Sequence, residues 1–136
     1  MTSSTDGELP SPSRDIARLT ADMDAHGYCL VAEALAPAKV AAVRARLAAQ
    51  AAAERAQGHQ RFSQVQDSAG ANQWVNMLLN KGQAFQDLLF NPLIDRVVEH
   101  LLGPGSLLSD ISAHITRPGN TLLGLHIDQW WLPPPV

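Results

Sequence analysis

The hydrophobic pattern of this chain changes its period once, near residue 107. Between residues 16 and 102 apolar residues mostly recur three or four positions apart, which is typical of helices that pack by one face. From Ile111 onward apolar and polar residues alternate, which is typical of a half-buried strand. We therefore expect an α+β fold in which helices come first and β structure begins late in the sequence.

The length and composition predict a single domain. The 136 residues are 46% hydrophobic and 17% charged, which is enough for one buried core. The net charge of −3 offers no attraction to nucleic acid or to an anionic membrane, so we expect neither as a partner. Cys29 is the only cysteine and excludes an intrachain disulfide. No targeting segment or membrane-length apolar run appears, so the expected location is the cytoplasm.

The first part of the chain predicts a tail and a helix. Residues 1–12 contain too little apolar surface to pack, and we expect a disordered tail followed by one domain over residues 13–136. Ser13 is the predicted N-cap of the helix, and Gly27 is expected to end it. The apolar run 28–31 that follows is expected to be a buried strand.

A second, alanine-rich helix is expected from Pro37 to about Gln57, because proline is favoured in the first turn and alanine propagates a helix. Its predicted inward stripe consists of Val40, Val43, Leu47 and Ala51. The polar residues 58–73 are expected to form a long loop, and such loops often carry function.

The rest of the chain predicts short elements. Residues 74–79 fit a strand or a helix, and periodicity does not decide between them. Helices are expected over 83–90 and from Pro92 to Gly103. Strands are expected over 111–116 and 121–128, and the turn between them suggests a hairpin.

A His-x-Asp pair lies on the last predicted strand. Side chains two apart on a strand point the same way, so His126 and Asp128 would share one face and could bind one metal ion. With a second His they would complete the facial triad of non-haem iron oxygenases. From spacing alone, a partly buried histidine with a local hydrogen bond is the competing interpretation.

Several segments together resemble the phytanoyl-CoA dioxygenase family, whose members depend on Fe(II) and 2-oxoglutarate. The opening of the chain, a helix followed by residues 27–31 and 35–37, also fits the usual start of that family. The order and spacing of the segments carry the resemblance more than any one of them does. The matching segments are 74–82, 85–89, 98–103, 118–119 and 125–129, followed by an aromatic pair and prolines.

The resemblance implies a fold, cofactors and metal ligands. Members of the family fold as a double-stranded β-helix, a jelly-roll barrel flanked by helices. By resemblance His126 and Asp128 are the iron ligands, Fe(II) is the cofactor, and 2-oxoglutarate is the co-substrate in the oxidation of a small molecule. Related halogenating enzymes lack the carboxylate, so Asp128 indicates hydroxylation.

The same resemblance suggests further positions around the metal. We expect His114 and Asn76 to contact the cofactor, and Trp74, Gln129 and Trp130 to face the substrate. For each of these side chains the alternative is an ordinary packing or surface role.

The resemblance also requires a distal metal-binding His and an Arg for 2-oxoglutarate, both downstream of the His-x-Asp pair. No His or Arg follows Asp128 in this sequence. We therefore expect the N-terminal portion of a truncated barrel, with the missing residues elsewhere in sequence or in a second chain. The alternative is a short protein without catalysis that acts as a binding module, for example by self-association through its strands.

Overall fold

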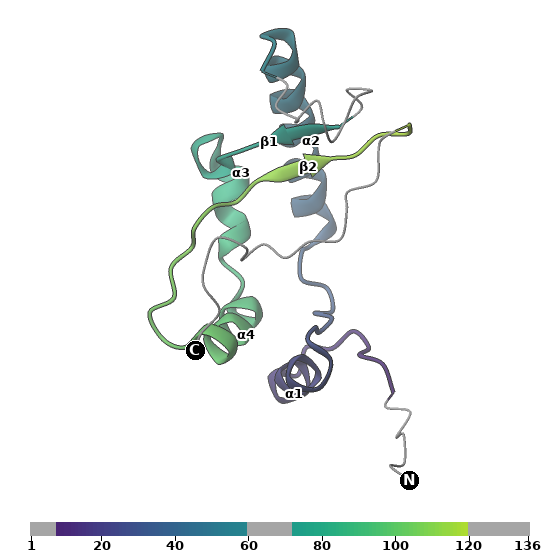
Figure 1. The fold of residues 1–136 in the computed structure, drawn as a ribbon, viewed down its shortest axis with the longest axis vertical. Helices are drawn as coiled ribbons and strands as arrows, with labels where there is room; N and C mark the ends of the chain where they lie inside the picture. The colour runs from purple at the N-terminus through teal and green to yellow at the C-terminus, as the bar shows by residue number, and fades with distance from the viewer. Residues whose placement is uncertain (1–7, 60–71, 120–136) are drawn as a thin grey trace, which may run out of the picture.

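The helices and strands form two neighbouring clusters. The computed structural model describes residues 8–59 and 72–119. Helix α1 (Ile16–His26) packs against α4 (Pro92–Leu102) at one end of the molecule (Figure 1). At the other end, α2 (Pro37–Ala56) lies across a small sheet and contacts the short helix α3 (Gln83–Gln86). The expected mixture of helix and strand is confirmed over these residues.

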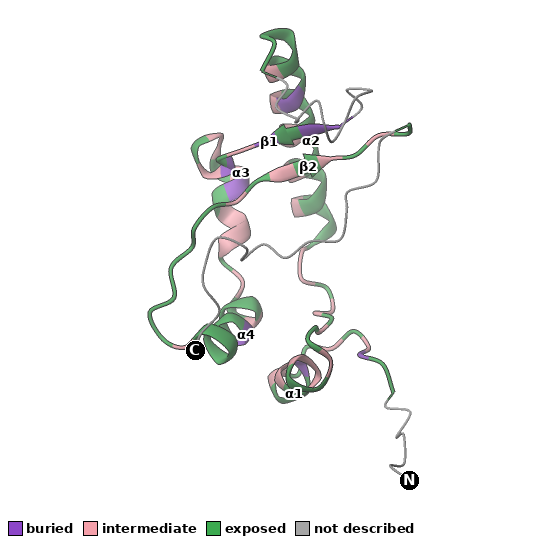
Figure 2. Cartoon of the chain, viewed as in Figure 1, coloured by how far each residue is buried: buried purple, intermediate pink, exposed green. Residues whose placement is uncertain are grey.

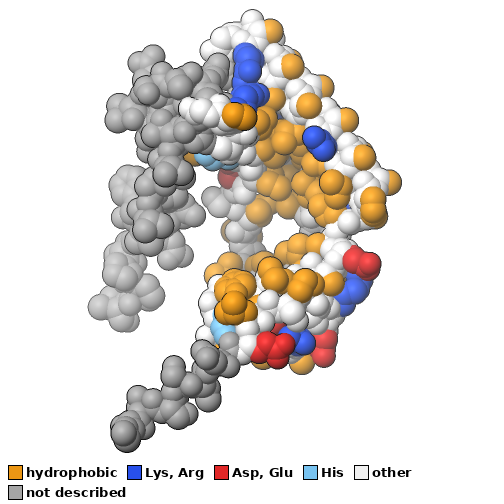
Figure 3. Space-filling view, turned by 90° about the vertical axis from the view of Figure 1, so that its right-hand side faces the viewer, with side chains coloured by type: hydrophobic (Ala, Val, Ile, Leu, Met, Phe, Trp, Pro, Cys, Tyr) orange, Lys and Arg blue, Asp and Glu red, His pale blue; other side chains and the backbone are white. Residues whose placement is uncertain are grey.

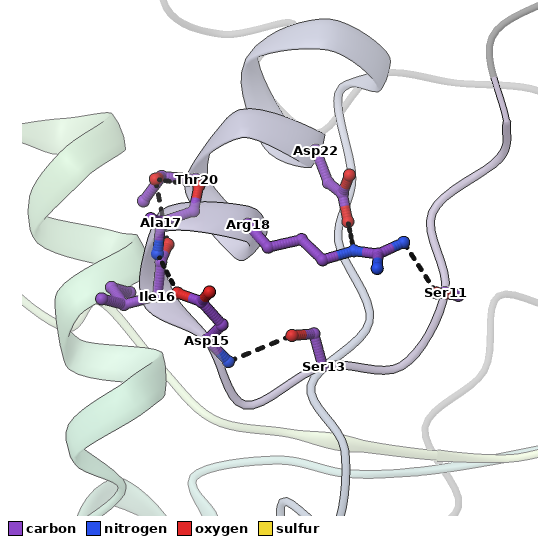
Figure 4. A network of polar contacts seen from close by, with 8 residues as sticks. All are labelled: Ser11, Ser13, Asp15, Ile16, Ala17, Arg18, Thr20 and Asp22. Carbon is purple, nitrogen blue, oxygen red and sulfur yellow. Dashed lines mark hydrogen bonds and ion pairs between the residues drawn. The ribbon is translucent and has the colours of Figure 1, made fainter.

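Helix α1 begins where expected but uses a different cap. The side chain of Asp15 accepts a hydrogen bond from Ala17 N at 2.9 Å, which makes Asp15 the N-cap (Figure 4). The prediction of Ser13 as the N-cap was wrong. Its Oγ accepts a hydrogen bond from Asp15 N, which lies before the first residue of α1. Gly27 ends the helix in the left-handed conformation, with φ of 76°, as predicted.

The segments before and after α1 are joined by an isolated bridge and do not form a strand. Ser13 N donates to Leu30 O, and Ala32 N donates to Ser13 O, which gives an isolated parallel bridge between Ser13 and Val31. The expected buried strand over 28–31 is therefore wrong, and Tyr28 and Leu30 are exposed. Of the expected tail, residues 1–7 lie outside the described part, while Pro10 is buried.

Helix α2 ends at Ala56, one residue before the predicted end. Ala51 is buried, and Val43 and Leu47 pack beside it, as the apolar spacing predicts. Val40 is 47% exposed, so its assignment to the inward stripe was wrong. It lies in the first turn of α2, before the helix reaches the core.

Within the described residues, the sheet consists of β1 (Gln73–Val75) and β2 (Ala113–Ile115), paired antiparallel. The ambiguous segment 74–79 thus begins as a strand and continues as the 3-10 helix η1 (Leu78–Asn80). The predicted helix over 83–90 is α3 followed by the 3-10 helix η2 (Asp87–Leu89). Helix α4 ends before Gly103 as predicted.

Strand β2 lies within the predicted strand 111–116 and is shorter than it. Its described partner is β1, which lies about forty residues earlier in sequence. The expected hairpin partner, 121–128, lies outside the described residues, and so do residues 60–71 of the expected loop.

The main core lies where α2, β1, η1 and α3 meet (Figure 2). Ala51, Val75, Leu78 and Phe85 form its buried cluster, and Ala113 and Ile115 of β2 pack against it. Hydrophobic burial of this kind drives the association of these elements, of which β1, η1 and α3 are too short to be stable alone. The core therefore fixes the sheet on α2 and determines which strand residues face away from it.

Candidate active site

The sheet of β1 and β2 has two faces: one packs against α2, and the other is not covered by α2. Gln73 and Val75 are completely buried on the α2 side, whereas Trp74 between them is 43% exposed. This alternation follows from the strand geometry, in which neighbouring side chains point to opposite faces. On β2, His114 is exposed between two half-buried residues in the same way.

Trp74 and His114 meet on the face that α2 does not cover. They are directly opposite each other in the strand register, and their rings contact edge to face, with centroids 5.9 Å apart and planes at 85°. Such pairs contribute about 0.5–1.5 kcal/mol beyond the area they bury. The contact unites two residues that the sequence analysis assigned separately, one to the substrate and one to the cofactor.

A hollow of about 430 Å³ lies between the end of α2 and the turn after β1. Trp74 and Asn76 line it together, so the structure brings these two predicted residues to one site. His114 is not among the residues that line it. The remaining lining residues are mostly polar: Gln50, Glu54, Gln57, His59, Met77, Asn80 and Lys81.

An ion pair between Glu54 and Lys81 forms part of this wall. Burial by itself would raise the pKa of Glu54, but hydrogen bonds from Lys81 and Gln50, with the positive charge of Lys81, bring that pKa below its ordinary value. Glu54 is therefore ionised at neutral pH. The opposite charges of Glu54 and Lys81 cancel, so the pair adds no net charge to the wall of the hollow.

Sequence reasoning missed the charged part of this hollow. Arg46 Nη2 donates to Gln50 Oε1 at 2.7 Å, and Gln50 Nε2 donates to Glu54 Oε1 at 2.8 Å, a ladder spaced by four residues along α2. That spacing is visible in the sequence and was available as a signal. The partner Lys81 is 27 residues further on, and no local pattern points to it.

Gly82 follows Lys81 in the turn, and its lack of a side chain lets the turn lie close to Arg46 of this ladder. Its φ is 134°, and a Cβ at this position would lie 3.2 Å from Arg46 Nε. A side chain here would meet both backbone strain and crowding. The turn that holds Lys81 against Glu54 thus depends on glycine.

The remaining predicted site residues, His126, Asp128, Gln129 and Trp130, lie outside the described residues. Within residues 8–59 and 72–119, no group of three or more His, Cys, Asp or Glu side chains is placed to hold a metal ion. The described part of the chain therefore supplies a sheet face, an aromatic pair and a polar hollow.

Comparison with known proteins identifies the family. The model of the phytanoyl-CoA dioxygenase family matches residues 23–135, which include α2, the described strands β1 and β2, and the His-x-Asp pair. The chain belongs to this family. The resemblance found in the sequence is confirmed.

A curated relative supports the same assignment. The chain is 33% identical over 129 residues to a protein of Aspergillus fumigatus called dioxygenase af480. The match covers 89% of this chain and 42% of that relative, so the chain spans less than half of the relative's length. No solved structure matches the chain. Over the described residues, no helix is both long and apolar enough to cross a membrane.

Proposed function

We propose that this phytanoyl-CoA dioxygenase family protein is an Fe(II)- and 2-oxoglutarate-dependent dioxygenase that hydroxylates a small molecule. The observation that carries the proposal is the His126-Ile127-Asp128 sequence inside the segment that the family model matches. Imidazole and carboxylate are the donor types found in the facial triads of non-haem iron oxygenases. The donor set of this chain therefore fits Fe(II).

His126 and Asp128 would hold the metal, and a further ligand is needed to complete the triad. When bound, iron would activate dioxygen, which is the oxidant; 2-oxoglutarate would supply two of the four electrons on its conversion to succinate and CO2, and the hydroxylated substrate would supply the other two. Asp128 keeps a carboxylate in the ligand set, in accord with hydroxylation instead of halogenation. The fold that we propose around this site is the jelly-roll barrel of the family.

We place the reaction on the sheet face that carries Trp74 and His114. On the opposite face, Gln73 and Val75 are fully buried, and Val75 belongs to the core cluster that includes Ala51 of α2. An exposed imidazole next to an indole provides a polar donor and a flat apolar surface side by side. In this proposal His114 and Asn76 orient the co-substrate, and Trp74 bounds the space for the substrate.

The test is iron-dependent turnover of 2-oxoglutarate by protein expressed from the complete coding sequence. Enzymes of this chemistry convert 2-oxoglutarate to succinate slowly even without substrate, so an unknown substrate does not block the assay. We expect succinate only with Fe(II) and oxygen, and its loss in His126→Ala and Asp128→Ala. His100→Ala is the matched control, because His100 is an exposed histidine of α4 bonded to Asp24.

The metal is measured on the same samples. Fe(II) binding, followed anaerobically by spectroscopy or metal analysis, should fall by at least about tenfold in the two ligand variants, because the number of ligands determines affinity. A wild-type protein that binds no iron and forms no succinate would contradict the proposal. Such a result would favour the binding-module interpretation.

A further inference from the structure

Met77 has a strained backbone conformation in the turn between β1 and η1. Its φ is 53° and its ψ is 49°, in the left-handed region that methionine rarely adopts. Glycine enters this region without steric cost, so the fold keeps a side chain where glycine would be easier to accommodate. Strain of this kind persists only where the surrounding structure imposes it, and it is concentrated at functional sites.

The neighbours of Met77 impose this conformation. Val75 and Leu78 are buried in the core on either side of it. Leu78 N donates to Ile111 O at 2.9 Å, and Asn80 N donates to Met77 O at 3.1 Å. The backbone is therefore fixed on both sides of Met77, and the direction in which its side chain leaves the turn is fixed with it.

The side chain of Met77 contributes little to the core. It is 58% exposed, and it is not among the described residues that pack in the hydrophobic cluster around Leu78. Exposure alone would indicate nothing, because hydrophobic side chains gather over a large part of the molecular face in Figure 3. The combination is informative, since an apolar side chain outside the core is kept at a position that costs stability.

Glu33 provides a comparison. It is the other residue besides glycine with a positive φ in the described parts of the chain, at 49°. Its charged side chain is exposed in a turn after Val31, and it does not line the candidate active site. Met77, in contrast, lines that hollow together with Trp74. The strain at Met77 thus coincides with the site, whereas the strain at Glu33 belongs to a surface turn.

We propose that Met77 contacts the apolar part of the substrate, with Trp74 as the second apolar contact in the same hollow. Thioether and indole are polarisable groups that favour apolar molecules. The carboxamides of Gln57 and Asn80 also line the hollow and can bind a hydroxyl or carbonyl group. The substrate class is therefore an apolar body that carries hydroxyl or carbonyl groups. This inference rests on the proposed function, because it names the substrate of that oxygenase.

The test follows the methyl signal of Met77 by NMR while indole, a flat apolar probe, is added without iron or 2-oxoglutarate. The protein carries ¹³C in its methionine methyl groups, and Met1, Met23 and Met77 are its three methionines. We expect the Met77 signal to shift, because an aromatic ring in contact changes the field at a methyl group, and the Met23 signal to stay. Other exposed apolar side chains also take up indole, so this signal is the readout instead of the total heat of binding.

Variants of Met77 separate contact from folding, with the indole N–H signal of Trp74 followed where the methyl signal is absent. Met77→Leu keeps an apolar side chain and should bind indole like the wild type. Met77→Gln should weaken binding about fivefold, the loss expected when an amide replaces the apolar end of one side chain. Met77→Gly relieves the strain, so it should unfold at no lower temperature than the wild type while binding indole at least as weakly as Met77→Gln. Glu33→Gly relieves the same strain outside the hollow and should leave indole binding unchanged.

The outcomes distinguish this inference from the proposed function. The contact is overturned if indole leaves the Met77 signal in place, or if Met77→Gln binds indole as well as Met77→Leu. It is also overturned if Met77→Gly lowers the unfolding temperature, since the side chain would then serve the fold. Succinate formation by the complete protein with no response at Met77 would keep the oxygenase and remove this contact. A response at Met77 without any succinate formation would instead contradict the proposed function.

Discussion

Trp74 and His114 stand directly opposite each other on neighbouring strands, with their rings in edge-to-face contact at 5.9 Å on the sheet face away from α2. The two residues are forty positions apart in sequence, and the strand pairing alone brings them together. The core is on the other face, so this pair lies outside the main hydrophobic cluster.

The contact between the two rings should be measurable as an energetic coupling. In a double-mutant cycle of Trp74→Ala and His114→Ala, we expect a coupling of about 0.5–1 kcal/mol in the free energy of unfolding, measured in urea. A control cycle of Trp74→Ala with His100→Ala should give no coupling, because His100 lies on α4 and contacts Asp24. Equal values in the two cycles would contradict the edge-to-face contact.

Gln73 should be far more important for stability than its polarity suggests. Its amide is fully buried and bridges Arg55 to the backbone of Ala51. Gln73→Leu has a similar size but removes both hydrogen bonds, and we expect a loss of about 1–3 kcal/mol in unfolding free energy. Gln57→Leu, at an exposed glutamine just after α2, should change stability by less than about 0.5 kcal/mol.

The sequence predicted the helices well because their signals are local. Proline at the start of α2 and α4, glycine after α1 and α4, and the apolar spacing of Val43, Leu47 and Ala51 all act within a few turns. The errors near α1 are also local. Ser13 and Asp15 are both good caps two residues apart, and only the backbone conformation decides which side chain reaches the helix.

The sheet and the hollow were harder to predict because their contacts are distant in sequence. The pairing of β2 with β1 was not predicted, because three short helical segments and α4 separate the two strands; the predicted hairpin with 121–128 lies outside the described residues. Lys81 and Glu54 are 27 residues apart and come together only where the turn after β1 packs against α2. The membership of the family and the His-x-Asp pair, in contrast, were readable directly from residue order.

The Glu54–Lys81 ion pair should make stability depend on pH. The folded state lowers the pKa of Glu54 below its usual value of 4.5, so the pair stabilises the fold fully above that value. This contribution is lost as the pH falls through the folded-state pKa. The difference in unfolding free energy between wild type and Glu54→Gln should therefore be larger at neutral pH than at pH of about 3.

A second background checks the origin of that pH dependence. When Lys81 is replaced by Met, both a hydrogen bond and the positive charge that lower the pKa of Glu54 are gone. Adding Glu54→Gln to Lys81→Met should then change the pH profile much less than it does in the wild type. An equal change in both backgrounds would show that Lys81 is not responsible.

Asn91 should hold α4 to the segment that precedes α2. Its Oδ1 accepts from Leu93 N at 3.1 Å and caps the helix, while its Nδ2 donates to Ala34 O at 2.9 Å. Asn91→Ala removes both bonds, and we expect a loss of about 1–2 kcal/mol in unfolding free energy together with faster amide exchange in the first turn of α4.

The contributions of the two bonds can be separated with Asn91→Asp. Aspartate keeps the capping acceptor, and its charge is favourable at a helix N-terminus, but it cannot donate to Ala34 O. Asn91→Asp should therefore protect the α4 amides like the wild type while destabilising the protein less than Asn91→Ala does. If the two variants expose the first turn equally, the bond to Ala34 is what positions α4, and the cap contributes little.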